Sequence, residues 1–432
     1  MYDVAVLGAG AAGLCAAINA AERGRSVVLL EKNRRAGVKI LMSGGTRCNL
    51  TNARGLRDLR VVTGPIDPAF DPRESLGARS IQKAFGDGGA FLGPSLRCLS
   101  VEKSVEMFER EGVRTKVEAN GKIFPATDRA VDVLDALLRR LGRTSALLRT
   151  AASVLGVEAV EEGFTLRLAD GEIQARKVIM AVGGKSFPGS GTTGDGYSWA
   201  RSFGHTIKDP RPALVPIRVG AAWVPDLKGL TVPDADIGVI DGAGASVLRR
   251  RESLLFAHFG LTGPAILDVS RAVARWEHVG EPRLRIDFLP AIDAESLDRQ
   301  LQASAREGRR QVLSILPDAI PKRLGVRLME AAEIPQDRTG PDLSRDERKR
   351  LGRAAKGLEL PITGTLGFEK AEVTSGGVNL DEVDPKTLMS LRQPGLYFAG
   401  EVLDLDGAIG GYNFQGAWSM GWLAAQSCST DD

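Results

Sequence analysis

Cysteine is scarce in this sequence, and the few cysteines are widely separated. Among 432 residues they stand only at positions 15, 48, 98 and 428, so no two form a Cys-x-x-Cys pair. This spacing excludes a redox-active dithiol of the thioredoxin type. Few and scattered cysteines are typical of a reducing compartment, and we expect a cytoplasmic protein.

Long apolar runs and an excess of one charge are also absent. The chain carries 57 lysines and arginines against 54 aspartates and glutamates, a net charge of +3. No apolar run approaches the length that spans a bilayer. A strand is expected from residue 2, with Asp3 inside it, where a signal peptide would have to lie. We therefore expect neither a membrane partner nor a signal peptide.

Clustered cations are limited to two stretches, residues 249–251 and residues 345–353. Both contain or adjoin acidic residues, such as Glu252 and Asp346. Such mixtures are more typical of a solvated helix face or strand edge than of a phosphate-binding surface. Together with the near-neutral net charge, they predict that nucleic acid is not a partner.

The first 32 residues carry the pattern around which the rest of the chain is organised. A buried strand is expected over residues 2–7, a glycine loop over 8–13, a helix over 14–23, and a second strand over 26–30 that ends at Glu31. A glycine pattern alone is weak evidence, but these elements are all in register. The order strand, loop, helix, strand and acid predicts an adenine dinucleotide site.

Each part of this site has a physical role. Gly8 permits a tight turn, Gly10 lets a pyrophosphate approach the backbone, and Gly13 lets the helix pack closely on the sheet. The helix N-terminus offers free N–H groups and a partial positive charge to phosphates. Glu31 is placed to accept hydrogen bonds from ribose hydroxyls. The residues that we assign here are Gly8, Ala9, Gly10, Ala11, Ala12, Gly13, Glu31 and Lys32.

A second segment, residues 32–52, mixes small, cationic and amide residues without a periodic pattern, so we expect a loop that wraps a ligand. Lys39 and Arg47 would neutralise a pyrophosphate, and the glycine pair would let the backbone approach a flat ring. The residues that we assign to the ligand here are Lys39, Ser43, Gly44, Gly45, Arg47, Cys48 and Asn49.

Residues 43–52, Ser-Gly-Gly-Thr-Arg-Cys-Asn-Leu-Thr-Asn, resemble the SGxGRCNxTN segment of bacterial flavoproteins known as BaiN-like bile-acid reductases or aminoacetone oxidases. In that family the segment contacts FAD, so the resemblance implies FAD as cofactor. The sequence departs from the family at Thr46, where glycine is usual, and the backbone is expected to differ there.

The resemblance extends over most of the chain. It includes residues 121–128, residues 254–267, which match the family's FTHFGLSGPAIL motif, and a TGDG turn within residues 189–197. The last stretch contains a second GxGxxG, but Pro188 precedes it in place of a strand. We therefore expect no second nucleotide-binding domain.

The C-terminal part is expected to return to the first domain. Residues 395–401 predict a strand that ends in glycine and glutamate, followed by a glycine loop and a helix over 414–425. In glutathione-reductase-like folds this arrangement forms the flavin half of an FAD site. Its carboxylate would accept from ribityl hydroxyls, and the helix N-terminus would face the flavin C2 carbonyl. The residues assigned are Gly400, Glu401, Gly411, Tyr412 and Asn413, with Gly183 after the strand over 177–182 and, by analogy with related flavoproteins, Val154 near the adenine.

We predict an α/β fold with a Rossmann-type FAD-binding domain, residues 1–209 and 365–432, that resembles glutathione reductase. An antiparallel β domain, residues 210–292 and 355–364, is inserted into it, because short apolar stretches alternate with turn residues there. A charged, helical insertion is predicted over 293–354.

The expected function is that of an FAD-dependent oxidoreductase, for which two chemistries compete. The bile-acid assignment implies reduction of an activated C=C bond in a small 3-oxo or enone molecule. The second assignment implies oxidation of a small amine such as aminoacetone, for which a low aromatic content of 5% offers little material for an aromatic cage. A flavoprotein that mainly binds RNA or protein is a third alternative. NAD(P)H is the candidate electron donor, and no metal is predicted.

Histidine is scarce, and one of the three histidines is the candidate proton donor. His205 and His278 stand in polar, unpatterned surroundings, whereas His258 lies between Phe256 and Phe259. Reduction of an alkene adds a hydride and a proton, and imidazole titrates near neutral pH, so we assign His258 as catalytic. The alternative is a core histidine bonded to a backbone carbonyl.

Overall fold

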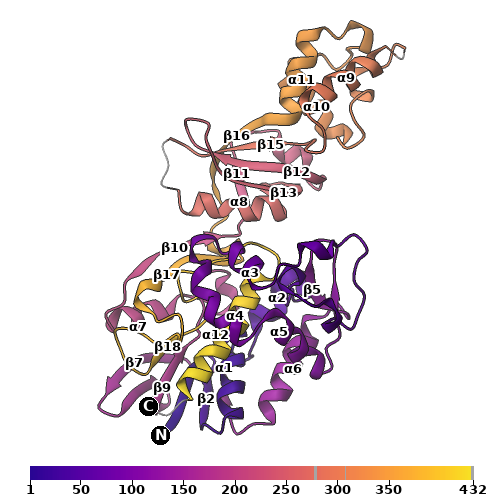
Figure 1. Cartoon of the computed structure of the whole chain (residues 1–432). Coiled ribbons are helices and arrows are strands. Elements are labelled where there is room, and N and C mark those ends of the chain that lie inside the picture. Colours follow the sequence, from indigo (N-terminus) through magenta and orange to yellow (C-terminus); the bar gives the residue numbers. More distant parts are fainter. Residues whose placement is uncertain (277–279, 307, 430–432) are drawn as a thin grey trace. The chain divides into compact units, whose positions relative to one another are not determined.

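The computed structural model describes residues 1–276, 280–306 and 308–429. The chain forms two compact units, each with its own hydrophobic core (Figure 1). Unit 1 comprises Met1–Arg211 and Val373–Asp432, and unit 2 comprises Pro212–Glu372. The helices predicted as a separate insertion therefore belong to the same unit as the β strands around them, while the predicted three-domain division stays a prediction.

The central sheet of unit 1 has the strand order β6-β2-β1-β9-β8-β7, and β18 joins it at β9. β1, β2, β6, β18 and the C-terminal half of β9 run parallel, whereas β7 and β8 are antiparallel. These strands are β1 (Tyr2–Leu7), β2 (Val27–Leu30), β6 (Leu147–Arg149), β7 (Val154–Val160), β8 (Gly163–Leu168), β9 (Gly171–Met180) and β18 (Leu396–Phe398). Because β18 completes a sheet begun by β1, the predicted return of the chain to a Rossmann-type domain is confirmed.

Two helices from opposite ends of the sequence pack together on this sheet. α1 (Ala11–Glu22) lies against α12 (Tyr412–Cys428), drawn in indigo and yellow in Figure 1. A Cβ at Gly421 would lie 2.2 Å from the carbonyl oxygen of Ala12, so glycine is required where the helices touch. The sequence predicted both helices, with the ends displaced by one to three residues.

The rest of unit 1 surrounds this layer. It contains a three-stranded antiparallel sheet, a two-stranded sheet and several helices. Their bounds are β3 (Thr51–Asn52), β4 (Thr115–Val117), β5 (Lys122–Pro125), β10 (Ile207–Ala213), β17 (Val373–Val378), α2 (Val38–Thr46), α3 (Ala78–Ala84), α4 (Gly93–Cys98), α5 (Val101–Arg110), α6 (Ala130–Gly142) and α7 (Asp195–Ser202).

Unit 2 is built on a closed barrel with the strand order β11-β14-β13-β12-β15-β16. Its neighbouring strands pair antiparallel, as the sequence predicted. The elements are β11 (Ile217–Val219), β12 (Thr231–Ile240), β13 (Ser246–Ala257), β14 (Gly260–Thr262), α8 (Pro264–Ala274), β15 (Arg283–Asp287), α9 (Ala294–Ala305), α10 (Lys322–Ala331), α11 (Arg345–Gly357) and β16 (Leu358–Thr365). In the part of the chain that the structure describes, no helix is long and apolar enough to cross a membrane.

Candidate functional site

The glycines of the N-terminal loop have two different roles: two of them allow close packing, and one borders open space. Gly8 has φ +92°, and a Cβ there would lie 2.7 Å from the carbonyl oxygen of Ala181. A Cβ at Gly13 would lie only 1.8 Å from the oxygen of Gly8, so helix and turn touch there. A Cβ at Gly10 would meet no atom within 4 Å. Gly8 and Gly13 therefore serve the fold, whereas Gly10 borders open space.

The helix that begins beside Gly10 has an unsatisfied N-terminus. α1 has no side-chain cap and no acidic residue in its first turn, where Ala11 and Ala12 stand. Its first N–H groups thus have no partner within the helix, and the positive end of the dipole is uncompensated. This is the donor set that a phosphate requires.

The carboxylate of Glu31 is fixed at the end of β2. It is buried, and it accepts hydrogen bonds from the backbone N–H of Ala9 at 2.9 Å and of Asn33 at 2.8 Å. Each oxygen keeps capacity for a further donor. The backbone N–H of Ala152 donates to the carbonyl oxygen of Glu31, two residues before Val154 at the start of β7. The residues assigned to ribose and adenine thus lie in neighbouring segments.

Lys32 ties the TGDG turn to this end of the sheet. Its Nζ lies 2.5 Å from the Thr193 hydroxyl and 2.5 Å from a carboxylate oxygen of Asp195. Before the turn, the structure has a short 3-10 helix, Pro188–Ser190, in place of a strand. The second GxGxxG is therefore part of unit 1, and no separate nucleotide-binding fold begins there.

A polar cluster joins four segments that are remote in sequence, at the flavin half of the predicted site. Lys39 Nζ lies 2.6 Å from Glu401 Oε2 and donates to the Ser186 hydroxyl at 2.6 Å. Glu401 Oε1 accepts from the Ser186 hydroxyl at 2.5 Å and from the backbone N–H of Thr374 at 3.0 Å. Gly400, with φ +81°, would place a Cβ 3.1 Å from the Cβ of Ala12 in the first turn of α1. The glycine after β18 therefore borders the N-terminal end of α1.

Ser186 and Thr374 in this cluster were not assigned from the sequence. Thr374 also accepts from the backbone N–H groups of Lys185 and Ser186, and a Cβ at Gly184 would lie 2.4 Å from its hydroxyl. The available signal was a hydroxyl residue two positions from a glycine pair: Ser186 follows the pair after β9, and Thr374 precedes the pair within β17. Gly183, which was assigned, has φ +74° in the same turn.

The prediction of a loop over residues 32–52 is wrong for residues 38–42, which are helical. α2 begins at Val38, and helical geometry ends at Ser43, followed by Gly44 with φ +55° and Gly45 with φ +67°. The apolar residues before the break include Ile40, which is buried in the core and gives the short helix its inner face. A five-residue amphipathic stretch is too short for its period to be visible in the sequence.

Arg47 and Cys48 after this break already have protein partners. The Arg47 guanidinium lies 4.0 Å from the centroid of the Phe124 ring, 2.6 Å from a carboxylate oxygen of Glu118 and 3.4 Å from one of Asp128. Cys48 is buried, and this burial raises the pKa of its thiol to about 12. The thiol therefore stays protonated at neutral pH, where the thiolate would be the reactive form.

The segment after Cys48 is joined to the loop before α12. The Asn52 side chain donates to the carbonyl oxygen of Gly410 at 3.0 Å, and the Trp418 indole donates to that of Leu50 at 3.0 Å. In the orientation that satisfies its amide, Asn49 accepts from the backbone N–H of Gly411 at 2.8 Å. The two segments that were assigned to one ligand are therefore adjacent.

The loop before α12 is held by its own residues. Asn413 exchanges two hydrogen bonds with the backbone of Gly407, at 2.8 and 3.0 Å. Gly411 precedes the helix with φ +88°, Tyr412 begins it and is buried, and no side chain caps the helix. The N-terminus of α12, like that of α1, keeps free N–H donors.

His258 lies in unit 2, in the two-residue turn between β13 and β14. It is exposed on that unit, and its ring packs edge-on against Phe259 with centroids 4.9 Å apart. The alternative of a core histidine is therefore wrong, because a tight hairpin turn directs its side chains outward. The catalytic assignment stays a prediction. Of the other two, His205 is buried, with the Ser390 hydroxyl and the Glu382 carboxylate beside its ring, and His278 lies outside the described residues.

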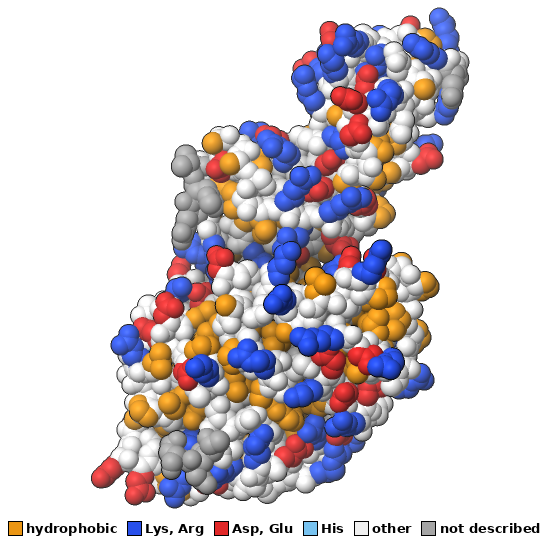
Figure 2. Space-filling model, viewed as in Figure 1, with side chains coloured by type: hydrophobic (Ala, Val, Ile, Leu, Met, Phe, Trp, Pro, Cys, Tyr) orange, Lys and Arg blue, Asp and Glu red, His pale blue; other side chains and the backbone are white. Residues whose placement is uncertain are grey.

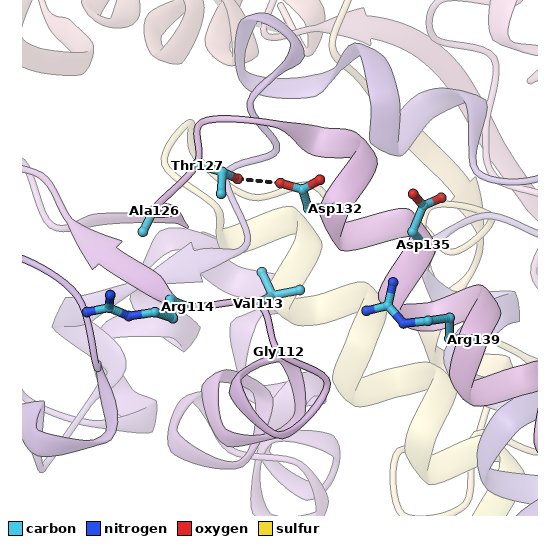
Figure 3. Close-up of a pocket in the computed structure, with 8 residues that line it drawn as sticks. All are labelled: Gly112, Val113, Arg114, Ala126, Thr127, Asp132, Asp135 and Arg139. Atoms are coloured by element: carbon cyan, nitrogen blue, oxygen red, sulfur yellow. Dashed lines mark hydrogen bonds between the residues drawn. The ribbon is translucent and has the colours of Figure 1, made fainter.

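A surface pocket in unit 1 is separate from this site. Figure 3 shows two arginines and two aspartates around it, with the Thr127 hydroxyl donating to Asp132 at 2.6 Å. None of the residues assigned to a cofactor lines it. Its lining residues are Gly112, Val113, Arg114, Ala126, Thr127, Asp132, Asp135 and Arg139.

Comparison with known proteins identifies the family of this chain. Residues 2–63 and 74–427 match the family model described as HI0933-like protein Rossmann domain. The open conformation of a flavocytochrome c3 fumarate reductase has a similar fold, with a TM-score of 0.50 and 14% sequence identity over 99% of this chain and 78% of that chain. At this identity the likeness shows the fold alone.

Two relatives match along almost their whole length. The ribosomal RNA dihydrouridine synthase of Escherichia coli is 34% identical over 432 residues, 98% of this chain and 97% of that protein. The 3-dehydro-bile acid delta(4,6)-reductase of Clostridium scindens is 34% identical over 441 residues, 99% of each. Because the first is named for ribosomal RNA, the prediction that nucleic acid is not a partner loses its support. The chain belongs to the HI0933-like family of FAD-dependent flavoproteins, and it is a flavin-dependent oxidoreductase.

Proposed function

We propose that unit 1 binds FAD non-covalently and that the enzyme reduces a C=C bond conjugated to a carbonyl group. The observation that carries the cofactor assignment is the contact between Gly400 and Ala12, which brings the flavin half of the predicted site to the phosphate half. The open space at Gly10 and the uncapped N-termini of α1 and α12 fit the pyrophosphate and the flavin carbonyl.

The protein's part in this chemistry is binding, orientation and electrostatics. Bound FAD supplies the hydride that the reaction requires. Glu31 would hold the ribose and Glu401 the ribityl chain, each fixed by the backbone donors described above. The free N–H groups of α12 would stabilise negative charge at the flavin C2 carbonyl, by up to about 2 kcal/mol in favourable geometry. A proton donor must complete the addition of two hydrogens, and His258 is the candidate.

The named activities of the relatives support the reaction class. The uracil ring has its C5=C6 bond conjugated to the C4 carbonyl, and a 3-oxo compound with a 4,6-diene has the same conjugation. In either conjugated system, reduction by a flavin would add a hydride to a carbon remote from the carbonyl and a proton to a carbon nearer to it. Since both relatives are 34% identical to this chain, identity does not select between a small enone and a uridine.

The experiment that tests the cofactor site replaces Gly10 by leucine. A Cβ at Gly10 meets no protein atom, so Gly10→Leu should fold normally but fill the space of the pyrophosphate and lose bound FAD. The matched control is Gly142→Leu at the exposed end of α6, where a Cβ also meets no atom within 4 Å. FAD content is measured by absorbance and folding by circular dichroism. Full FAD occupancy in a folded Gly10→Leu protein would show that the phosphate assignment is wrong.

A further inference from the structure

Helix α11 presents three cations on its outward face. Arg345, Lys349 and Arg353 follow one another at four-residue intervals, so they form one stripe along the helix. All three are exposed. The opposite face, which includes Leu351 and Ala355, is buried in the core of unit 2. Successive cations are about 6 Å apart along the axis, since the helix rises about 1.5 Å per residue.

These cations differ from their neighbours on the same helix. In the described residues none of the three forms an ion pair or a side-chain hydrogen bond. Arg348, by contrast, reaches Asp298 at 3.0 Å, and Arg350 donates to the carbonyl oxygen of Ala332 at 2.8 Å. The helix itself is fixed at its start by a capping box between Ser344 and Glu347. The stripe is therefore a row of cations without ion-pair partners in the described part of the chain, on a well-capped helix, with Asp346 as the exposed acid of the same first turn.

The other arginine-rich stretch of the sequence behaves differently. On β13, Arg249 lies 2.5 Å from Asp236, Arg250 3.3 Å from Asp268, and Arg251 2.7 Å from Asp234. The interpretation as a solvated, compensated surface therefore holds for residues 249–251. It does not hold for α11, where the sequence could not show which cations find partners.

We propose that the stripe Arg345, Lys349 and Arg353 binds the phosphate backbone of RNA. A row of exposed cations suits the phosphates of a nucleic-acid strand, which Lys and Arg side chains neutralise. Binding of a membrane by a basic helix requires an exposed apolar face, and the apolar face of α11 is buried in its own unit. Figure 2 shows Lys and Arg side chains spread over the helical part of unit 2. The stripe thus supplies affinity for RNA at a place other than the flavin.

The test measures RNA binding by the oxidised, FAD-loaded protein without an electron donor. The probe is a fluorescent RNA hairpin with uridines in its loop, and binding is followed by anisotropy over a salt series. The triple variant Arg345→Gln/Lys349→Gln/Arg353→Gln should bind on the order of tenfold more weakly or worse. The slope of log affinity against log salt should fall by about 2 to 3, because three phosphate contacts are lost. Each single variant should lower the slope by about 1, so the result does not depend on one multiple variant.

The matched control removes three exposed cations of unit 1, as Arg79→Gln/Lys83→Gln/Arg97→Gln, and should leave the slope unchanged. The charge-conserving variant Lys349→Arg should also bind normally. Absence of binding by the unchanged protein, an equal loss in both triple variants, or binding to anionic phosphatidylglycerol vesicles but not to RNA would each overturn the proposal. This inference rests on the proposed function only in the choice of uridines for the probe. A protein that reduces an enone but does not bind RNA would overturn the inference of an RNA-binding stripe and leave the proposed function standing.

Discussion

Thr46 stands where the family usually has glycine, and its backbone conformation is strained. It has φ +70°, in the left-handed region, directly after two glycines with positive φ. A β-branched residue is disfavoured there by about 1–2 kcal/mol, whereas glycine adopts the conformation freely and loses about 0.5–1 kcal/mol through its flexible unfolded state. The family's preference for glycine at this position, from which the sequence departs, thus has a backbone explanation.

Thr46→Gly should accordingly raise the free energy of unfolding, by about 0.5–1 kcal/mol. Urea unfolding of the FAD-loaded protein measures it. Thr46→Ala keeps the Cβ and should gain less than the glycine variant. A glycine variant no more stable than the alanine variant would show that the strain is relieved in solution.

His258 is exposed at a hairpin turn, so its ring is accessible to a ligand. His258→Asn should leave folding and FAD content unchanged but slow reoxidation of the reduced flavin by substrate, on the order of 100-fold or more, because the proton donor is lost. Anaerobic stopped-flow absorbance measures the rate. An unchanged rate would assign His258 to the turn alone.

The connection between α7 and β10 contains a buried histidine that the sequence did not reveal as buried. His205 Nε2 lies 2.7 Å from the Ser390 hydroxyl, and its ring packs edge-on against Phe398 with centroids 4.8 Å apart. Burial lowers the pKa of His205, and the nearby Glu382 carboxylate opposes this effect only in part. Flanking residues such as Gly204 and Thr206 are polar or small, so the neighbours in sequence gave no sign of the tertiary cover.

The pKa of His205 predicts a pH dependence with a definite sign. The unfolded state takes up a proton near the ordinary pKa of about 6.5, whereas the folded state resists it, so stability is present above that pH and is lost on acidification. The loss should not exceed about 1.4 kcal/mol per pH unit. His205→Gln should reduce the difference in urea midpoint between about pH 7.5 and about pH 5.5. An identical difference in both proteins would contradict this origin.

Elements with a long or strongly constrained pattern could be predicted from the sequence. The strands β1 and β2 and the helix α1 are read from a glycine loop between apolar runs, and the closing strand β18 from Gly400 and Glu401 at its end. The side-chain contacts of the site could not be predicted, because they join residues that are remote in sequence. The partners of Lys39 are Glu401 and Ser186, both more than a hundred residues away.

The described residues contain one parallel Rossmann-type sheet, which lies in unit 1. Unit 2 is built on an antiparallel barrel. NAD(P)H would then have no Rossmann site of its own and would have to reach the flavin directly. We expect weak affinity, with a dissociation constant for NADPH well above the micromolar range of dedicated sites, as measured by titration of the FAD-loaded protein. Sub-micromolar binding would show that a dedicated site exists.

Net charge was a poor guide to partners, because it averages surfaces with different roles. The arginines of β13 are compensated by aspartates, whereas those on the outward face of α11 are not. A sum of +3 over the chain hides that difference. The positions of acids across strands and helices, which decide it, are set by the fold.

The central claim is that this flavoprotein reduces a C=C bond conjugated to a carbonyl, and one measurement tests it most directly. The FAD-loaded protein is reduced anaerobically and mixed separately with a 3-oxo-4-ene steroid and with unmodified ribosomal RNA, while flavin absorbance and product mass are followed. The account predicts rapid reoxidation by at least one of them, with a product that carries two additional hydrogens on the former double bond. A flavin that stays reduced with both, together with rapid reduction of the oxidised protein by aminoacetone, would contradict it.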